Sequence, residues 1–218
     1  KTSSIELEVR CIKKTGELCW ILCKGRVVEE DSQGRALMIS GTQADITLLK
    51  THETELDRVA NYDALTGLPN RRLLLDRFQQ MIAHVQRNGS LCAVCFMDLD
   101  GFKVINDRYG HQAGDAMLIH AASAIKSNIC EFEIAARMGG DEFIVLLGGA
   151  HHRSDIQRIT GEICEAVALP IPWANSQIKV SASLGVAWYP EDGEDLDDLI
   201  FKADTAMFQS KASIAAHA

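Results

Sequence analysis

The chain has 218 residues, 47% of them hydrophobic, and a formal net charge of −8 at pH 7. This length allows one ordinary domain with a fragment, or two small domains, and the composition suffices for a buried core. The acidic balance argues against a nucleic-acid surface, which is normally basic, and no apolar run reaches the length of a membrane span. We therefore expect a small phosphorylated ligand as the partner, with no nucleic acid and no membrane segment in this chain.

Residues 1–47 predict three strands joined by two hairpin turns. Residues 5–12 alternate apolar and polar side chains, and strand-like runs follow at 18–28 and 36–42 after turns that each contain a Gly. A three-stranded sheet with one uncovered apolar face is marginal in isolation. We therefore expect this part to pack on a neighbour or on a second copy of the chain.

Residues 48–62 predict a helix free of Gly and Pro. Leu49, Leu56 and Val59 lie at the seven- and three-residue intervals of a coiled-coil seam, but the run is too short to specify a coiled coil alone. Two interpretations stay open: an amphipathic helix packed on its own domain, and a helix that dimerises.

The remainder, residues 63–218, predicts helices and strands that interleave without the strict βα repetition of a doubly wound fold. Helix-like apolar spacing is found at 71–87, 116–128, 155–168 and 196–213. Strands are expected at 91–97, 134–138, 143–147 and 178–188. This pattern predicts an α+β fold, with helices packed against a central sheet.

Seven cysteines are scattered along the chain, and Cys92 and Cys95 have the C-x-x-C spacing. Residues three apart on a strand point to opposite faces, so these thiols should pack on separate sides of the core as small hydrophobes. The odd total and irregular spacing fit a reducing compartment. We therefore expect a cytoplasmic location, which is compatible with membrane attachment of a longer protein through other segments.

The most informative segment is 137–147, where Gly139, Gly140, Asp141 and Glu142 lie at the bend between two apolar strands. Glycine dominates two-residue turns with positive φ. Asp and Glu have low strand propensity, and at a hairpin tip they place oxygen ligands where backbone can approach a phosphate. A plain turn accounts for the glycines but not for two acids beside a buried strand, so we favour a metal-binding hairpin.

A second acidic segment follows the apolar residues 91–97, which predict a central buried strand that ends in Asp98 and Asp100. Asp98, Asp141 and Glu142 can then converge on one divalent ion. Carboxylate oxygens without a nearby His or Cys suit Mg²⁺ or Mn²⁺ rather than zinc, and Mg²⁺ usually takes one or two carboxylates plus substrate phosphates. The predicted chemistry is phosphoryl or nucleotidyl transfer.

Together with four further motifs, these two segments resemble the GGDEF domains, or diguanylate cyclases, which condense two GTP molecules into cyclic di-GMP and release pyrophosphate. The motifs occur in order at 63–71, 98–107, 109–115, 137–147, 183–187 and 202–207. The resemblance covers about residues 63–213 and implies a central, mainly antiparallel sheet flanked by helices, as in nucleotidyl cyclases and polymerase palms. It also implies Mg²⁺ or Mn²⁺ as the cofactor and a homodimer in which each domain supplies half of the site.

The resemblance assigns catalytic and metal-binding roles to four positions. Asp98, Asp141 and Glu142 match the metal-binding acids, and the backbone carbonyl of Leu99 is a further metal ligand. Asp141 and Glu142 are the implied catalytic residues. Asp141 also occupies the position that helps to deprotonate the attacking ribose hydroxyl, whose pKa a nearby metal lowers.

The implied substrate-binding residues are Phe102, Lys103, Asn106, Asp115, Gly139, Gly140 and Lys211. Asn106 and Asp115 match the guanine-binding pair, and a carboxylate can accept from guanine N1–H and N2–H₂, donors that adenine lacks on that edge. Lys103 and Lys211 match cationic contacts to the triphosphate, where positive charge stabilises leaving pyrophosphate. The plain alternatives are a helix cap for Asn106, a favourable charge at a helix start for Asp115 and a solvated position for either lysine.

Two departures from the family pattern are visible. After Lys211 the family continues through a Gly-Arg-Asn segment whose arginine reaches the phosphates, whereas residues 212–218 contain no arginine. Either this tail is foreign to the natural protein, or the chain binds triphosphate with one cation fewer. The product-inhibition motif Arg-x-x-Asp is replaced by Cys130 and Glu133. We predict no high-affinity feedback there, and tight binding of cyclic di-GMP that is abolished by changing either residue would refute this.

Residues 1–47 resemble the C-terminal half of a PAS sensor domain, in strand order and in the ending at 41–47. The helix at 48–62 then corresponds to the signalling helix that family members place between sensor and cyclase, and residues 63–218 to the GGDEF domain.

Two functional classes follow. The preferred one is a dimeric diguanylate cyclase under the control of an N-terminal sensor, which the intact Asp141 and Glu142 favour. The alternative is a low-turnover GTP-binding regulatory domain that controls an attached cyclic di-GMP phosphodiesterase, which the altered tail favours. A cyclase that uses ATP ranks third because of Asn106 and Asp115.

Overall fold

The structure is a computed structural model that describes residues 4–215. It divides into two compact units, Lys1–Ala60 and Asn61–Ala218. Helices and antiparallel sheets alternate along the chain, so the predicted α+β fold class is confirmed. Residues 216–218 of the altered tail lie outside the described residues, and the PAS assignment and the three domain ranges remain predictions.

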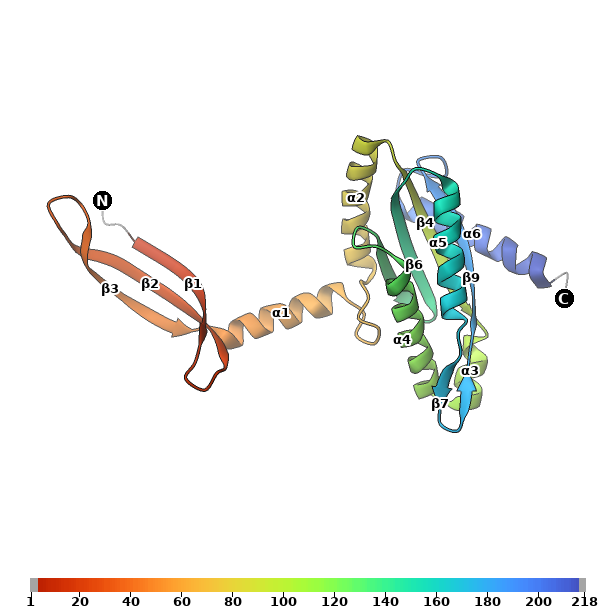
Figure 1. Cartoon of the computed structure of the whole chain (residues 1–218), viewed down its shortest axis with the longest axis horizontal. Helices are drawn as coiled ribbons and strands as arrows, with labels where there is room; N and C mark the ends of the chain where they lie inside the picture. Colours follow the sequence, from red (N-terminus) through yellow and green to blue (C-terminus); the bar gives the residue numbers. More distant parts are fainter. Residues whose placement is uncertain (1–3, 216–218) are drawn as a thin grey trace. The chain divides into compact units, whose positions relative to one another are not determined.

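The first unit is a three-stranded antiparallel sheet followed by a helix (Figure 1). Strands β1 (Ser4–Ile12), β2 (Leu18–Glu30) and β3 (Ala36–Asp45) pair in the order β1-β2-β3. Helix α1 (Thr47–Asn61) follows directly. The alternating pattern and the turn glycines therefore form the two predicted hairpins.

The start of α1 is bonded to its own sheet. The Thr47 hydroxyl accepts a hydrogen bond from the Trp20 N–H at 2.9 Å, and the Lys50 ammonium lies 2.8 Å from the Glu8 carboxylate. Asp45 closes the turn before the helix by accepting from the Thr47 N–H at 2.9 Å. These contacts fix the direction in which the helix leaves β3.

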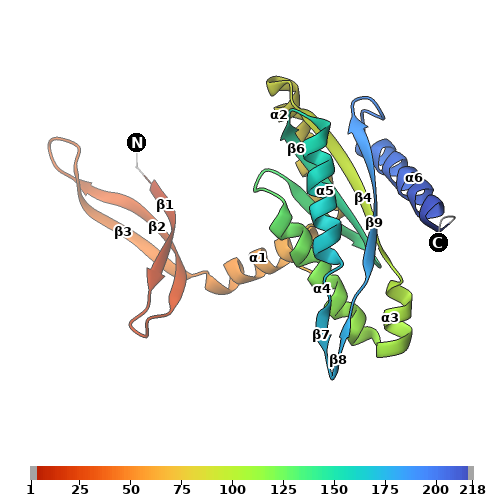
Figure 2. The same cartoon turned by 45° about the vertical axis from the view of Figure 1, so that its right-hand side comes forward.

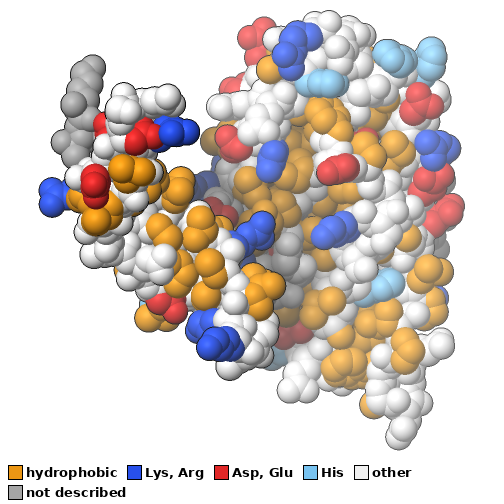
Figure 3. All heavy atoms as spheres, turned by 60° about the vertical axis from the view of Figure 1, so that its left-hand side comes forward, with side chains coloured by type: hydrophobic (Ala, Val, Ile, Leu, Met, Phe, Trp, Pro, Cys, Tyr) orange, Lys and Arg blue, Asp and Glu red, His pale blue; other side chains and the backbone are white. Residues whose placement is uncertain are grey.

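The first unit exposes many apolar side chains, and Figure 3 shows hydrophobic groups on its surface. On the sheet, Leu7 and Ile39 are 53% and 54% exposed. On α1, none of whose residues is buried, Leu49, Leu56 and Val59 are 53%, 70% and 65% exposed. The coiled-coil spacing of α1 is thus carried by side chains that are open to solvent, and nothing described packs over them.

The second unit is built on a four-stranded antiparallel sheet in the order β5-β6-β4-β9, with a separate β7-β8 hairpin. Its strands are β4 (Leu91–Asp100), β5 (Ile134–Gly139), β6 (Glu142–Ala150), β7 (Ile171–Trp173), β8 (Ser176–Ile178) and β9 (Ser181–Tyr189). Its helices are α2 (Arg71–Asn88), α3 (Phe102–Tyr109), α4 (His111–Asn128), α5 (Arg153–Val167) and α6 (Leu196–Ala215).

Helices cover both faces of this sheet (Figure 2). On one face, buried residues of α4 and α5 pack with Cys95, Met97 and Phe143. On the other, buried residues of α2 and α6 pack with Cys92 and Val94. The two thiols thus lie in opposite cores as predicted, and burial raises the pKa of Cys92 to about 12.

Some elements differ from the sequence-based expectations. The segment 102–109 forms a separate short helix, α3, between Gly101 and Gly110, whose φ values of 74° and 86° suit glycine. The strand expected at 178–188 is divided, because Ile178 ends the β7-β8 hairpin and β9 begins at Ser181. No helix within residues 4–215 combines the length and apolarity that crossing a membrane requires.

Candidate active site

The β5-β6 turn lies against the end of β4, which brings acidic residues from distant segments to one edge of the sheet. Asp98 on β4 pairs with Glu142 on β6, and the Leu99 N–H donates to the Asp141 carbonyl at 3.3 Å. At the turn, Gly140 has φ 54°, a value that favours glycine. The antiparallel register therefore makes Asp98 and Glu142 direct cross-strand neighbours, with Asp141 beside them on the turn.

Partial burial and like charges at this edge disfavour the ionised forms of Asp141 and Glu142. Partial burial, and then the charge of Asp98, raises the pKa of Asp141. Partial burial and the charges of Asp98, Asp141 and Asp204 raise the pKa of Glu142. Like charges directly opposite on neighbouring strands destabilise a sheet, so this edge favours a cation.

Lys211 of α6 already provides one positive charge at this edge. Its ammonium donates to Asp98 and lies 3.0 Å from an oxygen of Asp100. The Asp100 carboxylate is held in turn by the hydroxyls of Ser181 and Ser183, which donate at 3.0 Å and 2.9 Å. Burial acts to lower the pKa of Lys211, but the hydrogen bonds to both aspartates outweigh it, and the net effect is a raised pKa.

The chemistry of these side chains fits Mg²⁺ or Mn²⁺, because the candidate ligands Asp98, Asp141 and Glu142 offer carboxylate oxygens and the nearby negative charges raise the pKa of Glu142. Within residues 4–215, no group of three or more His, Cys, Asp and Glu side chains is placed so that it could hold a metal ion. Convergence of Asp98, Asp141 and Glu142 on one ion, with the Leu99 carbonyl, therefore stays a prediction.

The implied guanine and phosphate residues lie on α3 and α4. Phe102, Lys103 and Asn106 are on α3, and Asp115 is on α4. Lys103 and Asp115 are exposed, whereas Phe102 and Asn106 are half-buried. Among the described residues, no ion pair or hydrogen bond joins the Lys103 side chain to the acids. The structure thus places Lys211, but not Lys103, in contact with the acidic edge.

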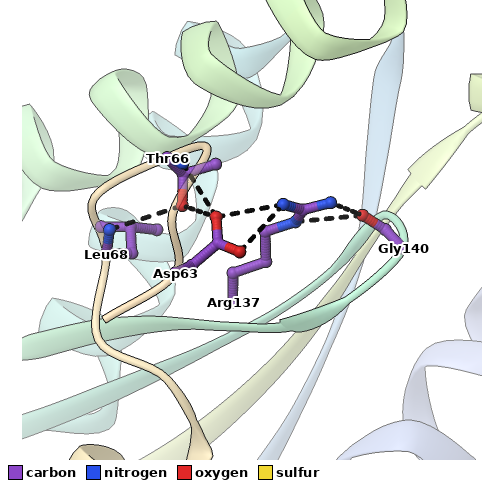
Figure 4. A network of polar contacts seen from close by, with 5 residues as sticks. All are labelled: Asp63, Thr66, Leu68, Arg137 and Gly140. Carbon is purple, nitrogen blue, oxygen red and sulfur yellow. Dashed lines mark hydrogen bonds and ion pairs between the residues drawn. The ribbon is translucent and has the colours of Figure 1, made fainter. Parts of the chain in front are cut away.

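Figure 4 shows a network that sequence reasoning missed, in which the opening motif at 63–71 is bonded to the signature turn. The Arg137 guanidinium donates to both Asp63 oxygens at 3.0 and 3.1 Å and to the Gly140 carbonyl at 2.7 and 3.1 Å. Asp63 also accepts from the N–H and the hydroxyl of Thr66 at 2.8 and 2.6 Å.

This network sets the charge state of Asp63. Burial by itself raises the pKa of Asp63, but the hydrogen bonds from Thr66 and Arg137 outweigh it and hold that pKa below its usual value. The ionised carboxylate therefore anchors Arg137, and Arg137 anchors the carbonyl next to Asp141. The sequence marked both motifs, but it held no signal that would pair residues 74 positions apart.

The segment that replaces the product-inhibition motif closes on itself. A Glu133 carboxylate oxygen accepts from the Cys130 N–H at 2.8 Å, and the Cys130 side chain is exposed. One acceptor of Glu133 is thus engaged within its own turn, and the lack of product inhibition there stays a prediction.

Similar proteins were found at the levels of family, sequence and structure. The family model described as "Diguanylate cyclase, GGDEF domain" matches residues 60–216. A bifunctional diguanylate cyclase/cyclic di-GMP phosphodiesterase, MucR of Pseudomonas aeruginosa, is 41% identical over 165 residues, which are 76% of this chain and 24% of that protein. The cyclic di-GMP phosphodiesterase PdeR of Escherichia coli K12 is 38% identical over 175 residues, 80% of this chain and 26% of that protein.

Among solved structures, a sensory box/GGDEF family protein from Caulobacter crescentus CB15 is similar with a TM-score of 0.68 and 38% identity. The match covers 70% of this chain and 99% of that one. The first curated relatives are much longer, since the chain spans only 24%, 21% and 26% of their lengths.

Proposed function

The chain belongs to the GGDEF family of diguanylate cyclase domains, and on this premise we propose that it condenses two GTP molecules into cyclic di-GMP and two pyrophosphates. The observation that carries the proposal is the register at the sheet edge, where Glu142 of the signature turn pairs directly with Asp98 of β4. Asp141 and Glu142, whose pKa values burial and neighbouring negative charge raise, are suited to a site that recruits a cation together with a triphosphate.

Asp98, Asp141 and Glu142, with the Leu99 carbonyl, would hold Mg²⁺ or Mn²⁺. Such an ion neutralises triphosphate charge and lowers the pKa of a nearby ribose hydroxyl. The Gly139-Gly140 turn has no side chain between its backbone and the site, since a Cβ added at either glycine meets no atom within 4 Å.

The protein's own step is the removal of a proton. The 3′-oxygen of one GTP attacks the α-phosphorus of the other, the bond to the β-phosphate breaks, and pyrophosphate leaves with its electron pair. Asp141, which lies on the signature turn beside Asp98 and Glu142, accepts the 3′-hydroxyl proton. Glu142, the next residue of the turn, is the second proposed catalytic residue and would hold the metal ion.

Selectivity for guanine would lie on α3 and α4. The Asp115 carboxylate can accept from N1–H and N2–H₂, and the Asn106 amide can donate to the carbonyl oxygen that guanine has where adenine has an amino group. Phe102, at the start of α3, would line the pocket beside them.

Lys103 and Lys211 would contact the triphosphate. The ammonium of Lys211 already lies at the acidic edge, because Asp98 and Asp100 bind it there. Lys103 is exposed on α3, so its long side chain is free to meet the phosphates from the solvent side.

Each domain would supply half of the reaction, so two GTP-loaded domains must meet for reciprocal attack. The exposed leucines of α1 support self-association. We further propose that the first unit is the C-terminal half of a PAS-like sensor, and that α1 transmits its state to the cyclase as a signalling helix.

A second candidate is a regulatory domain that binds GTP with little turnover and controls an attached cyclic di-GMP phosphodiesterase. The likeness to PdeR, named a phosphodiesterase, and to bifunctional MucR supports it. Residues 212–218, which lack the arginine of the family pattern, also favour this second candidate.

The test is to incubate the protein with GTP and Mg²⁺, or with ATP and Mg²⁺, and to separate the nucleotides by chromatography. We expect cyclic di-GMP from GTP alone, and its loss in Asp141→Ala and Glu142→Gln. Glu165→Gln, an exposed acid on α5, is the matched control and should keep activity. GTP that is bound but unchanged at high protein concentration would instead support the regulatory domain.

A further inference from the structure

Gly114, a buried glycine on α4, leaves room for the side chain of Asn106, one of the proposed guanine-binding residues. A Cβ built on Gly114 would lie 2.0 Å from Asn106 Oδ1 and 2.9 Å from Asn106 Cγ. It would also lie 3.1 Å from Phe102 Cζ. The Asn106 amide therefore rests directly on the backbone of α4, one residue before Asp115.

The corner between α3 and α4 produces this approach. The Gly110 N–H donates to the Asn106 carbonyl at 2.9 Å, and the Ala113 N–H donates to the Gly110 carbonyl at 3.0 Å. The last turn of α3 and the first turn of α4 are thus joined through one glycine. Within residues 4–215 the Asn106 side chain has no hydrogen-bond partner, so its amide is available to a ligand.

Backbone geometry does not explain a glycine at this position. Gly114 is not among the residues with positive φ, and it lies inside a helix, where alanine is more favourable than glycine. Space explains it, because any side chain would displace the Asn106 amide. Gly161 on α5 is the contrasting case, since a Cβ added there meets no atom within 4 Å.

We propose that Gly114 is a specificity-determining position, which by lacking a side chain holds the Asn106 amide beside Asp115 for guanine. This inference rests on the proposed function, because it deepens the assignment of the guanine site. Gly114 itself touches no base and acts by positioning Asn106.

The test measures binding of GTP and ATP by isothermal titration calorimetry to the wild type, Gly114→Ala, Gly161→Ala and Asn106→Ala. Gly114→Ala should weaken GTP binding on the order of tenfold, the usual effect of losing a specific polar contact, and leave ATP binding unchanged. Gly161→Ala gains the same helix propensity without meeting any atom, so its preference for GTP should equal that of the wild type.

The double variant Gly114→Ala/Asn106→Ala separates positioning from misfolding. Once the amide is gone, the closest atom to the added methyl group is Phe102 Cζ at 3.1 Å, which needs to move by only a few tenths of an ångström, so the double variant should bind GTP as well as Asn106→Ala alone. Additive losses, or equal losses for GTP and ATP in Gly114→Ala, would overturn the inference. A wild type with no preference for GTP would overturn the proposed function as well, whereas a normal preference retained in Gly114→Ala would overturn only the inference.

Discussion

At the scale of single residues, the candidate site carries more negative than positive charge: several carboxylates lie near the ammonium of Lys211. Asp98 and Glu142 are cross-strand neighbours with Asp141 beside them on the turn, and Lys211 pairs with Asp98 and Asp100 and only partly offsets the raised pKa of Asp141. The raised pKa values of Asp141 and Glu142 mean that folding disfavours their ionised forms. Such a site lowers the stability of the folded protein without metal, and in return it binds a cation and a phosphate.

This trade predicts that Glu142→Gln stabilises the protein without metal at pH 7. The pKa of Glu142 is raised in the folded state, so its ionisation destabilises the fold at neutral pH. The penalty disappears as the pH falls below the ordinary Glu value of 4.5, because the group is then protonated in both states. Thermal melts should therefore show a higher Tm for the variant at pH 7 and a shrinking difference toward pH 4.

Mg²⁺ should reverse the order of the Tm values of wild type and Glu142→Gln. Mg²⁺ that binds the folded state raises Tm by mass action, so wild-type Tm should rise with Mg²⁺ more than that of Glu142→Gln. Glu165→Gln serves as the control and should follow the wild type. A lower Tm of Glu142→Gln at pH 7 without metal would contradict the charge excess.

At the scale of elements, the signature turn depends on the loop before α2. Arg137 links Asp63 to the carbonyl of Gly140, next to the proposed base, and its side chain is only 12% exposed. A change at Asp63 should therefore reach Asp141 through the turn, although no contact joins these two acids among the described residues.

Asp63→Ala should lower the free energy of unfolding by about 1–3 kcal/mol, because it leaves the Arg137 guanidinium without its carboxylate. Cyclic di-GMP production should fall with it, since the turn loses its anchor. Urea unfolding monitored by circular dichroism gives the stability change, and Asp107→Ala, an exposed acid on α3, is the control. Equal stability of the two variants would refute this role of the network.

The same network has a defined pH dependence. The pKa of Asp63 is lowered in the folded state, so its contribution is present above the ordinary Asp value of 3.8 and is lost as the pH falls through the folded value. Wild type and Asp63→Ala should therefore converge in stability at strongly acidic pH.

The sequence predicted the buried elements best. The apolar runs before Asp98 and after Glu142 specified β4 and β6, and the family motifs located the acids. The short α3 was not predicted, since eight residues between two glycines carry little periodicity, and neither were the three-residue strands of β7-β8. The contacts from Lys211 to Asp98 and from Arg137 to Asp63 span 113 and 74 residues, and local patterns cannot report them.

At the scale of the whole molecule, two compact units are joined at α1, and the proposed reaction needs two copies of the second unit. The seam of Leu49, Leu56 and Val59 is exposed along α1. A second copy could cover it, because leucine-rich stripes at this spacing pair helices.

Leu56→Glu should therefore weaken self-association and cyclic di-GMP production while GTP binding per chain stays unchanged. Leu56 is 70% exposed, so the fold should tolerate the charge. Sedimentation velocity over a range of concentrations measures the association, and Thr54→Glu, off the seam on the same helix, is the control. Unchanged association of Leu56→Glu would show that α1 is not the dimer contact.

The central claim is that the acids at the end of β4 and on the signature turn join two GTP molecules. Phosphorus NMR of the protein with GTP and Mg²⁺ tests it most directly, since it identifies every phosphorus product at once. We expect a cyclic phosphodiester signal together with two pyrophosphates per cyclic dinucleotide, and neither signal with Glu142→Gln. Release of inorganic phosphate as the main product, or a spectrum of unchanged GTP at high protein concentration, would contradict the account.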